Sequence, residues 1–416
     1  MDRSIVAGGM WLLALGEMQA VEKMNTCWAE GVGSFQVAGN GMGGAIPWIR
    51  EGEFVTIDFD LLEGVADIQA AGWETISYRI VHCDEDWQRS SLMETEYMQG
   101  FQDLALRDME SARGTALSYT HYRLRVPNDD VQLKVSGNYA VQFFRASGER
   151  MATGCFCVSE NKLSFTAEVS GNTLTDTYGG SQQLDFSIDT KGLGQRVLDR
   201  DLRIRAYQNG RLDNAVKVDK PFAIAGSRLD YSHLPELIFE AGNEFRRCEF
   251  LTSRERGMRV DRMDFFNGFA HVTLTEDKGR SVYRFDRDIN GRFVVNCIPC
   301  QFPETEGDYF FVHFTLRTAR LPEGEMYLSG EFRPYTFEEC DRMQYDEEEG
   351  GYVQSLLLKQ GQYNYHYLFL PNGSSRASTA AIEGNFHQTE NEYSIYVYFR
   401  PLGEKYDRLA GVYIRK

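Results

Sequence analysis

The sequence predicts an all-β fold, a multi-domain array of antiparallel β-sandwiches with few short helices. Two observations carry this prediction. Apolar and polar residues alternate with a period of two over most of the chain, and Gly, Asn, Asp or Pro bound the alternating runs. The chain has 416 residues, of which 42% are hydrophobic and 25% charged. At roughly 150 residues per domain, this length suits two to four folded domains with separate cores.

A first sandwich is expected over residues 28–160. Val55, Ile57 and Phe59 share one face of an alternating run, with polar residues on the other face. The same pattern recurs over residues 76–80, 122–126 and 139–143. Residues 91–110 have the composition for one or two helical turns.

Two further sandwiches are expected over residues 161–300 and 309–416, separated by a linker at 301–308 that lacks apolar residues at either period. Within the second, Asn209 and Gly210 suit a two-residue hairpin turn, because both tolerate positive φ. Arg211 would then begin the return strand.

The net charge limits the classes of partner that the chain can bind, and the N-terminal sequence bears on whether the chain is exported. Lys and Arg total 44 against 61 Asp and Glu, a net charge of −17, which repels nucleic acid and anionic lipid. No apolar run reaches the roughly 18 residues of a membrane-spanning helix. Residues 1–27 read as a degenerate secretion signal or a disordered lead-in, because the apolar stretch after Arg3 is interrupted by glycines and followed by Glu17. An exported precursor, a misplaced start and a cytoplasmic start all stay open.

Several clusters imitate chemical sites. Residues 82–86 gather imidazole, thiol and carboxylates, but a strand end entering an acidic turn, with Trp87 returning to the core, is the favoured interpretation. Residues 286–291 imitate a calcium loop without its final Glu, and a hairpin turn is favoured. Cys297 and Cys300 form a lone Cys-x-x-Cys pair whose disulfide state is left open. The common hydrolase, zinc-protease and nucleotide signatures are absent from the sequence, so we expect no catalytic residues, cofactor or metal, and a small-molecule ligand is not favoured.

An aromatic stripe occupies residues 363–369, where Tyr363, Tyr365, Tyr367 and Phe369 share one face of a strand. Such a stripe could stack on sugar rings. A stripe at strand spacing is more often sandwich core, and this alternative is favoured.

Unusual strings spread in order along residues 45–416 resemble the type IX secretion system plug protein family of Gram-negative bacteria. They lie at residues 78–83, 86–87, 96–97, 100–101, 119–122, 136–139, 208–211, 213–215, 242–247, 288–293, 359–365 and 400–407. The resemblance implies a non-enzymatic protein of the periplasm, peripheral to the outer membrane. Its implied partner is the very large outer-membrane translocon barrel, whose periplasmic opening it would cap while the pore is idle.

Two of these regions are candidate docking elements, because Arg and aromatic residues on loops suit interfaces. The residues are Asp84, Asp86, Trp87, Asn243, Glu244, Arg246 and Arg247. The alternative is that the same residues hold the domains together.

The segment 309–416 separately looks like the early-set immunoglobulin-like module that binds α-glucans in other proteins. Those modules stack sugar on exposed Trp residues, and Tyr335 stands at the corresponding place here. The second hypothesis is therefore a carbohydrate-binding protein that uses Tyr335.

Overall fold

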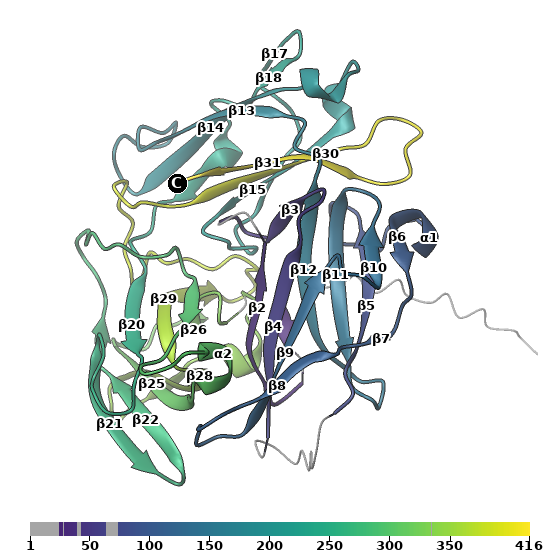
Figure 1. Ribbon diagram of the computed structural model, residues 1–416. Helices are drawn as coiled ribbons and strands as arrows, with labels where there is room; N and C mark the ends of the chain where they lie inside the picture. Colours follow the sequence, from purple (N-terminus) through teal and green to yellow (C-terminus); the bar gives the residue numbers. More distant parts are fainter. Residues whose placement is uncertain (1–24, 28, 40–42, 64–73, 334) are drawn as a thin grey trace, which may run out of the picture.

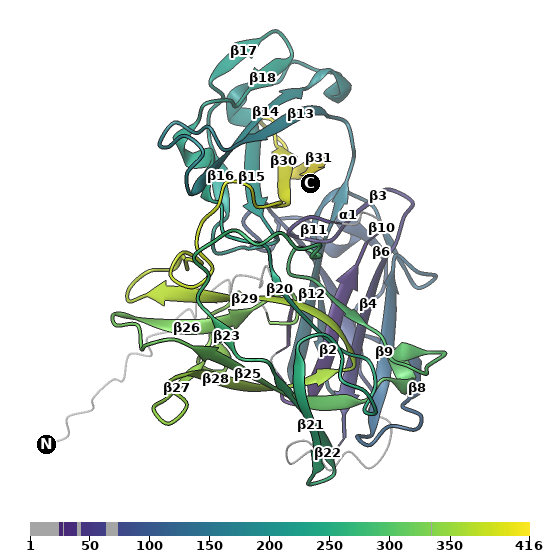
Figure 2. The ribbon, with the colours of Figure 1, turned by 90° about the vertical axis from the view of Figure 1, so that its left-hand side faces the viewer.

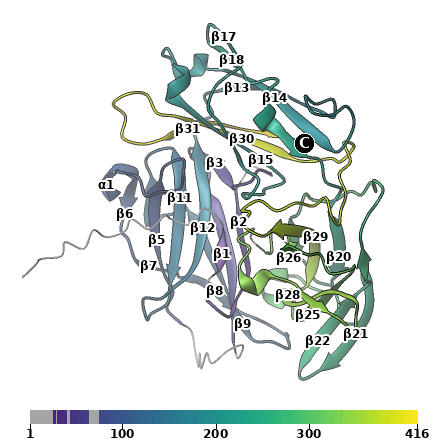
Figure 3. The ribbon, with the colours of Figure 1, turned by 180° about the vertical axis from the view of Figure 1, so that it is seen from behind.

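The computed structural model describes residues 25–27, 29–39, 43–63, 74–333 and 335–416. It confirms the all-β prediction: three sandwiches of mostly antiparallel strands pack together, and the described part has two short α-helices, α1 (Glu94–Tyr97) and α2 (Pro303–Glu306). The second sandwich lies above the other two, which lie side by side (Figures 1 and 3).

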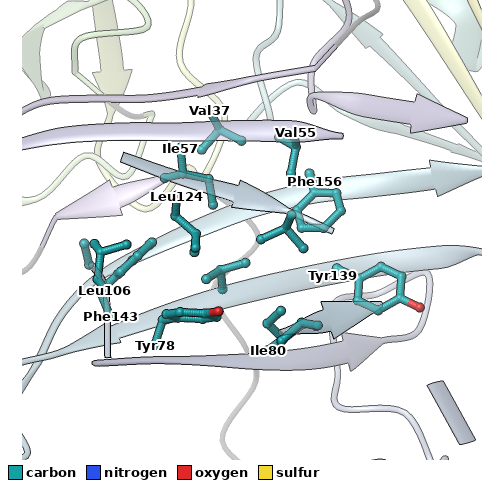
Figure 4. Packing of buried hydrophobic residues seen from close by; sticks show 14 of the residues in the cluster. Val37, Val55, Ile57, Tyr78, Ile80, Leu106, Leu124, Tyr139, Phe143 and Phe156 are labelled. Atoms are coloured by element: carbon teal, nitrogen blue, oxygen red, sulfur yellow. The ribbon is translucent and has the colours of Figure 1, made fainter. Parts of the chain in front are cut away.

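The described part of the first sandwich contains twelve strands, and its core lies between two sheets. The strands are β1 (Thr26–Cys27), β2 (Val32–Ala38), β3 (Trp48–Arg50), β4 (Val55–Leu62), β5 (Ser77–Cys83), β6 (Met98–Gly100), β7 (Leu104–Ala105), β8 (Asp108–Ser111), β9 (Tyr119–Val126), β10 (Val131–Leu133), β11 (Gly137–Phe144) and β12 (Arg150–Ser159). One sheet has the order β1-β12-β11-β5-β7, with β3 beside β12, and the other β2-β4-β9-β8; β6 and β10 form a small pair. Val55, Ile57 and Phe59 are fully buried between the sheets, as the alternation predicts. Figure 4 shows Val55 and Ile57 among their neighbours in this core.

The second sandwich is discontinuous in sequence. Its strands are β13 (Ser164–Ser170), β14 (Ser181–Asp189), β15 (Leu202–Gln208), β16 (Val216–Val218), β17 (Ala223–Ala225), β18 (Arg228–Asp230), β19 (Ile238–Glu240), β30 (Tyr393–Phe399) and β31 (Arg408–Arg415). One sheet has the order β13-β14-β18-β17, with β19 beside β14, and the other has the order β16-β15-β30-β31.

The third sandwich is built from the chain between these two parts. Its strands are β20 (Arg246–Phe250), β21 (Val260–Phe266), β22 (Phe269–Leu274), β23 (Asp277–Lys278), β24 (Phe293–Val295), β25 (Tyr309–Arg317), β26 (Gly324–Ser329), β27 (Gln344–Asp346), β28 (Gly351–Lys359) and β29 (Gly361–Pro371). One sheet has the order β20-β29-β24, with β26 beside β29, and the other β21-β22-β25-β28-β27, with β23 beside β25.

This pairing differs from the expected segments 161–300 and 309–416. β15 pairs with β30 over its whole length, from Leu202 with Phe399 to Gln208 with Tyr393, so the C-terminal strands complete the second sandwich rather than a separate module (Figure 2). The expected boundaries fail because alternation shows which face a residue takes, not which strand pairs with it. Residues 301–308 contain the short helix α2 and are not a bare linker. Of the expected lead-in 1–27, residues 1–24 lie outside the described residues, and β1 (Thr26–Cys27) pairs with β12.

Candidate functional site

Apolar side chains join the first and second sandwiches. Trp87, 2% exposed, packs there among buried residues of both sandwiches, which include Cys155, Tyr207, Tyr398 and Leu409. Strand β12 is consequently buried along nearly all its length, because one face belongs to the core of the first sandwich and the other to this joint. The interpretation of Trp87 as a side chain returned to a core agrees with this position.

An ionic cluster borders the same joint. The Glu85 carboxylate is buried and faces Arg203 at 3.7 Å and Lys217 at 3.5 Å, and it bonds to Arg205, which also binds Asp86. Burial raises the pKa of Glu85, although Arg205 opposes that shift. The cations come from the second sandwich and the carboxylates from the turn after β5, so the turn joins two sandwiches.

The string 242–247 lies where the second sandwich leads into the third. Asn243 is buried, and its Nδ2 donates to the Glu383 carbonyl at 3.0 Å. Glu244 is buried as well: its Oε1 accepts from the Tyr283 hydroxyl at 2.6 Å and from the Glu390 amide at 3.0 Å. These residues therefore tie β20 to the segment that returns to the second sandwich.

Arg246 is the central cation of this region. It is 5% exposed, with Nη1 at 2.6 Å from Asp277 Oδ1 and Nε at 3.0 Å from Glu383 Oε1. Burial alone would lower the pKa of Arg246, but Glu383 and Asp277 raise it above its usual value. The neighbouring Arg247 is partly exposed and pairs with Asp286 at 2.7 Å.

A third joint connects the first and third sandwiches. Asp60 is fully buried, and its Oδ2 accepts from Lys359 Nζ at 2.6 Å and from the Tyr309 hydroxyl at 2.7 Å. Its Oδ1 lies 2.8 Å from His121 Nδ1. Lys359 is 1% exposed and lies over the Tyr119 ring, 4.2 Å from its centroid. Burial lowers the pKa of Lys359, and Asp60 only partly offsets this effect.

His121 extends the network toward a cleft of about 350 Å³ between the two sandwiches. Its Nε2 lies 3.4 Å from Asp58 Oδ1, a contact of charges rather than an aligned hydrogen bond. Burial by itself lowers the pKa of His121, but the interactions with Asp58 and Asp60 outweigh it and raise the pKa to about 9. Imidazolium is therefore the form of His121 in the folded state at neutral pH, and it partly neutralises the buried carboxylate of Asp60 and the partly exposed carboxylate of Asp58.

Sequence reasoning gave no role to the residues of this third joint. Lys359 and His121 belong to two of the strings that carry the family resemblance, at residues 359–365 and 119–122. Nothing in the sequence links positions so far apart. Asp60 shares the polar face of β4 with Asp58, a pattern that an ordinary solvated strand also shows. Only the docking of the third sandwich turns this face into an interior.

The residue offered for sugar binding has a different environment from the one expected. Tyr335 is 9% exposed, and its ring is flanked by Arg211 at 6.0 Å and His366 at 6.1 Å from its centroid. Tyr363, Tyr365 and Tyr367 are buried in the third core. The expectation of an exposed stacking ring at Tyr335 is wrong, because the second sandwich supplies Arg211 against it.

The remaining candidates also have local structural roles. Arg211 does not begin a return strand: it is buried in the loop after β15, bonds Asp213 at 2.6 Å and donates to the Ala377 carbonyl. Asn290 and Gly291 form a turn with positive φ, but the expected hairpin is not formed, because residues 279–289 before the turn contain no strand and β24 after it pairs with β29. Cys297 and Cys300 form a disulfide.

The described residues contain no cluster of three or more His, Cys, Asp or Glu with metal-binding geometry. Among the helices of the same described part, none has the length and apolar character to cross a bilayer.

Residues 32–160 match the family model of the type 9 secretion system plug protein 1st domain. The chain belongs to this plug protein family. The match covers β2 to the end of the first sandwich, including the turn 84–87. A crystal structure of a hypothetical protein from Parabacteroides merdae is 42% identical to this plug-family chain, covers 95% of it and 99% of its own chain, and superimposes with a TM-score of 0.89. No curated protein matches the chain.

Members of this family are non-enzymatic components of a secretion system. Membership in the family therefore indicates a secretion-associated role for this chain. The resemblance expected from the sequence is thereby confirmed. Several of its strings contribute residues to the joints between sandwiches: Trp87 packs between the first and second, and His121 and Lys359 belong to the joint of the first and third.

Proposed function

We propose that this chain is a non-enzymatic periplasmic plug that docks, as one rigid frame, on the periplasmic opening of the outer-membrane translocon barrel and keeps the idle pore closed. The observation that carries the proposal is the plug-domain match over the first sandwich. The three joints support it. A body with buried ionic and apolar joints loses little conformational freedom when it docks, so more of the contact energy is available for holding the pore shut.

The partly exposed members of the candidate set are Asp84, Asp86 and Arg247, and they stay proposed docking contacts. The buried members, which are Trp87, Asn243, Glu244 and Arg246, favour the alternative that the strings hold the sandwiches together. A docking role for them would need the frame to open.

Affinity isolation from detergent-solubilised envelopes tests the proposal. A tagged chain should bring down a giant barrel subunit, and Arg247→Glu should reduce its yield while Arg254→Glu, an exposed Arg on another loop, leaves it unchanged. If the tagged, folded chain recovers no barrel subunit, the docking proposal is wrong. Unchanged recovery with Arg247→Glu removes only this side chain from the docking surface.

Pore closure has a separate readout. Deleting the gene should increase the entry of a large hydrophilic antibiotic across the outer membrane, and the wild-type chain should restore the barrier. An unchanged barrier in the deletion strain would exclude the closing role even where the barrel is recovered.

A further inference from the structure

The hairpin formed by β21 and β22 extends beyond the rest of the third sandwich (Figures 1 and 2). β21 is the edge strand of its sheet, since it pairs with β22 alone in the order β21-β22-β25-β28-β27. Phe265 and Phe266 at its end are 69% and 49% exposed. A long exposed edge of this kind readily pairs with another strand.

The register shows which backbone groups of β21 face outward. Phe266 pairs with Phe269 across a two-residue turn, Asn267 and Gly268, whose positive φ angles suit a tight hairpin. The residues flanking such a turn form a hydrogen-bonded pair, and the pattern alternates from there. The N–H and C=O groups of Met263 and Phe265 therefore point away from β22, and within the described residues no hydrogen bond is found for them.

The charged residues on either side of Met263 are complementary to the same residues of a second copy in an antiparallel arrangement. Arg262 precedes it and Asp264 follows it, both side chains are exposed, and they pair with each other at 2.6 Å. In an antiparallel arrangement centred on Met263, Arg262 lies opposite Asp264 of a second copy, and the reverse holds on the other side. These are positions without backbone hydrogen bonds, where opposite side chains come closest.

We propose that β21 pairs antiparallel with β21 of a second copy of this chain, so that two third sandwiches share one continuous sheet. Met263 faces its own counterpart with two backbone hydrogen bonds, and a ring of four alternating charges covers one face. The pairing is isologous and therefore closes as a dimer rather than growing into a fibre. The proposal is independent of docking on the barrel.

A second copy suits this edge better than an unrelated strand. The order Arg262, Met263, Asp264 offers a matching antiparallel partner in its own sequence, whereas an unrelated segment would need an acid and a base at the same spacing. The projecting hairpin also lies at the opposite end of the molecule from the second sandwich (Figure 1). One strand pair buries little area, so the expected dimer is weak.

Sedimentation of the full chain over a concentration series up to about 1 mM, a range that reaches weak affinities, tests the proposal. We expect a reversible monomer–dimer equilibrium. Arg262→Asp alone and Asp264→Arg alone each place like charges opposite one another twice and should raise the dissociation constant about tenfold or more. An equimolar mixture of the two variants restores both opposite pairs and should give a heterodimer.

A backbone variant provides a second test. Phe265→Pro removes an outward N–H without breaking the ladder to β22, and should weaken the dimer more than Phe265→Ala, which keeps that N–H. Circular dichroism checks that each variant is folded. The proposal is overturned if the wild-type chain stays monomeric at every concentration, or if neither charge reversal changes the dissociation constant of the dimer. Either result holds whether or not the barrel is recovered in the envelope experiment.

Discussion

Replacing Lys359 with Met tests whether the buried ion pair holds the first and third sandwiches together. The substitution keeps an unbranched side chain but leaves the Asp60 carboxylate, which is 0% exposed, without its closest cation. Removing one partner of a buried pair costs about 3–5 kcal/mol. Tyr309 and protonated His121 still donate to Asp60, so we expect the lower end, a loss of about 3 kcal/mol in the free energy of unfolding.

Urea unfolding with a double-mutant cycle measures this effect. Lys359→Met, Asp60→Asn and the double variant give the coupling energy directly, and we expect about 2 kcal/mol or more for such a buried, hydrogen-bonded pair. The control is Lys405→Met, whose ammonium is exposed 2.8 Å from Glu96 and should leave the midpoint unchanged. A cost under about 1 kcal/mol for Lys359→Met, the level of exposed pairs, would refute the reasoning.

His121 gives the same joint a pH dependence. Its pKa is raised from 6.5 in the unfolded chain to about 9 in the folded one, so its contribution is fully present below pH 6.5 and lost as pH rises through 9. The shift corresponds to about 3 kcal/mol at most. The free energy of unfolding should therefore fall between these pH values in the wild-type chain and fall less in His121→Asn. Parallel pH profiles for the two chains would contradict the assignment.

Three further substitutions test the other contacts. Arg205→Met should lower the free energy of unfolding by about 2 kcal/mol, because it leaves two carboxylates at the joint of the first and second sandwiches, and limited proteolysis should show faster cleavage between them. Arg246→Met should cost about 3–5 kcal/mol in urea unfolding, since two buried carboxylates lose their shared cation. Tyr335→Ala should lower the thermal midpoint, because a packed ring is lost. In glucan-affinity electrophoresis, wild type and Tyr335→Ala should both run unretarded.

The local part of the fold could be predicted from the sequence. Val55, Ile57 and Phe59 are buried on one face of β4, as their spacing indicates, and the short helix α1 lies within the stretch expected to be helical. These predictions succeed because side-chain direction depends on neighbours along the same strand.

The arrangement of the strands could not be predicted. β30 follows β29 in sequence but pairs with β15, almost two hundred residues earlier, and alternation carries no signal for that pairing. Asp60 shows the same limit at a single residue. Its position on the polar face of β4 predicts a solvent-exposed side chain, but the third sandwich packs on that face and buries it.

Several of the strings by which the chain resembles its family contribute buried residues where sandwich meets sandwich, and this changes where a docking surface should be sought. Trp87 and Lys359 are nearly inaccessible, so a partner could reach them only if a joint opened. Opening would separate the ion pairs and expose the apolar surface of the joints to water, a cost that a surface contact does not require. Docking requires less free energy if these residues hold the frame rigid and the partner is recognised by exposed loops, strand edges and aromatic side chains around it. A variant that weakens a joint should therefore reduce stability and barrel recovery together, whereas Arg247→Glu should reduce recovery alone.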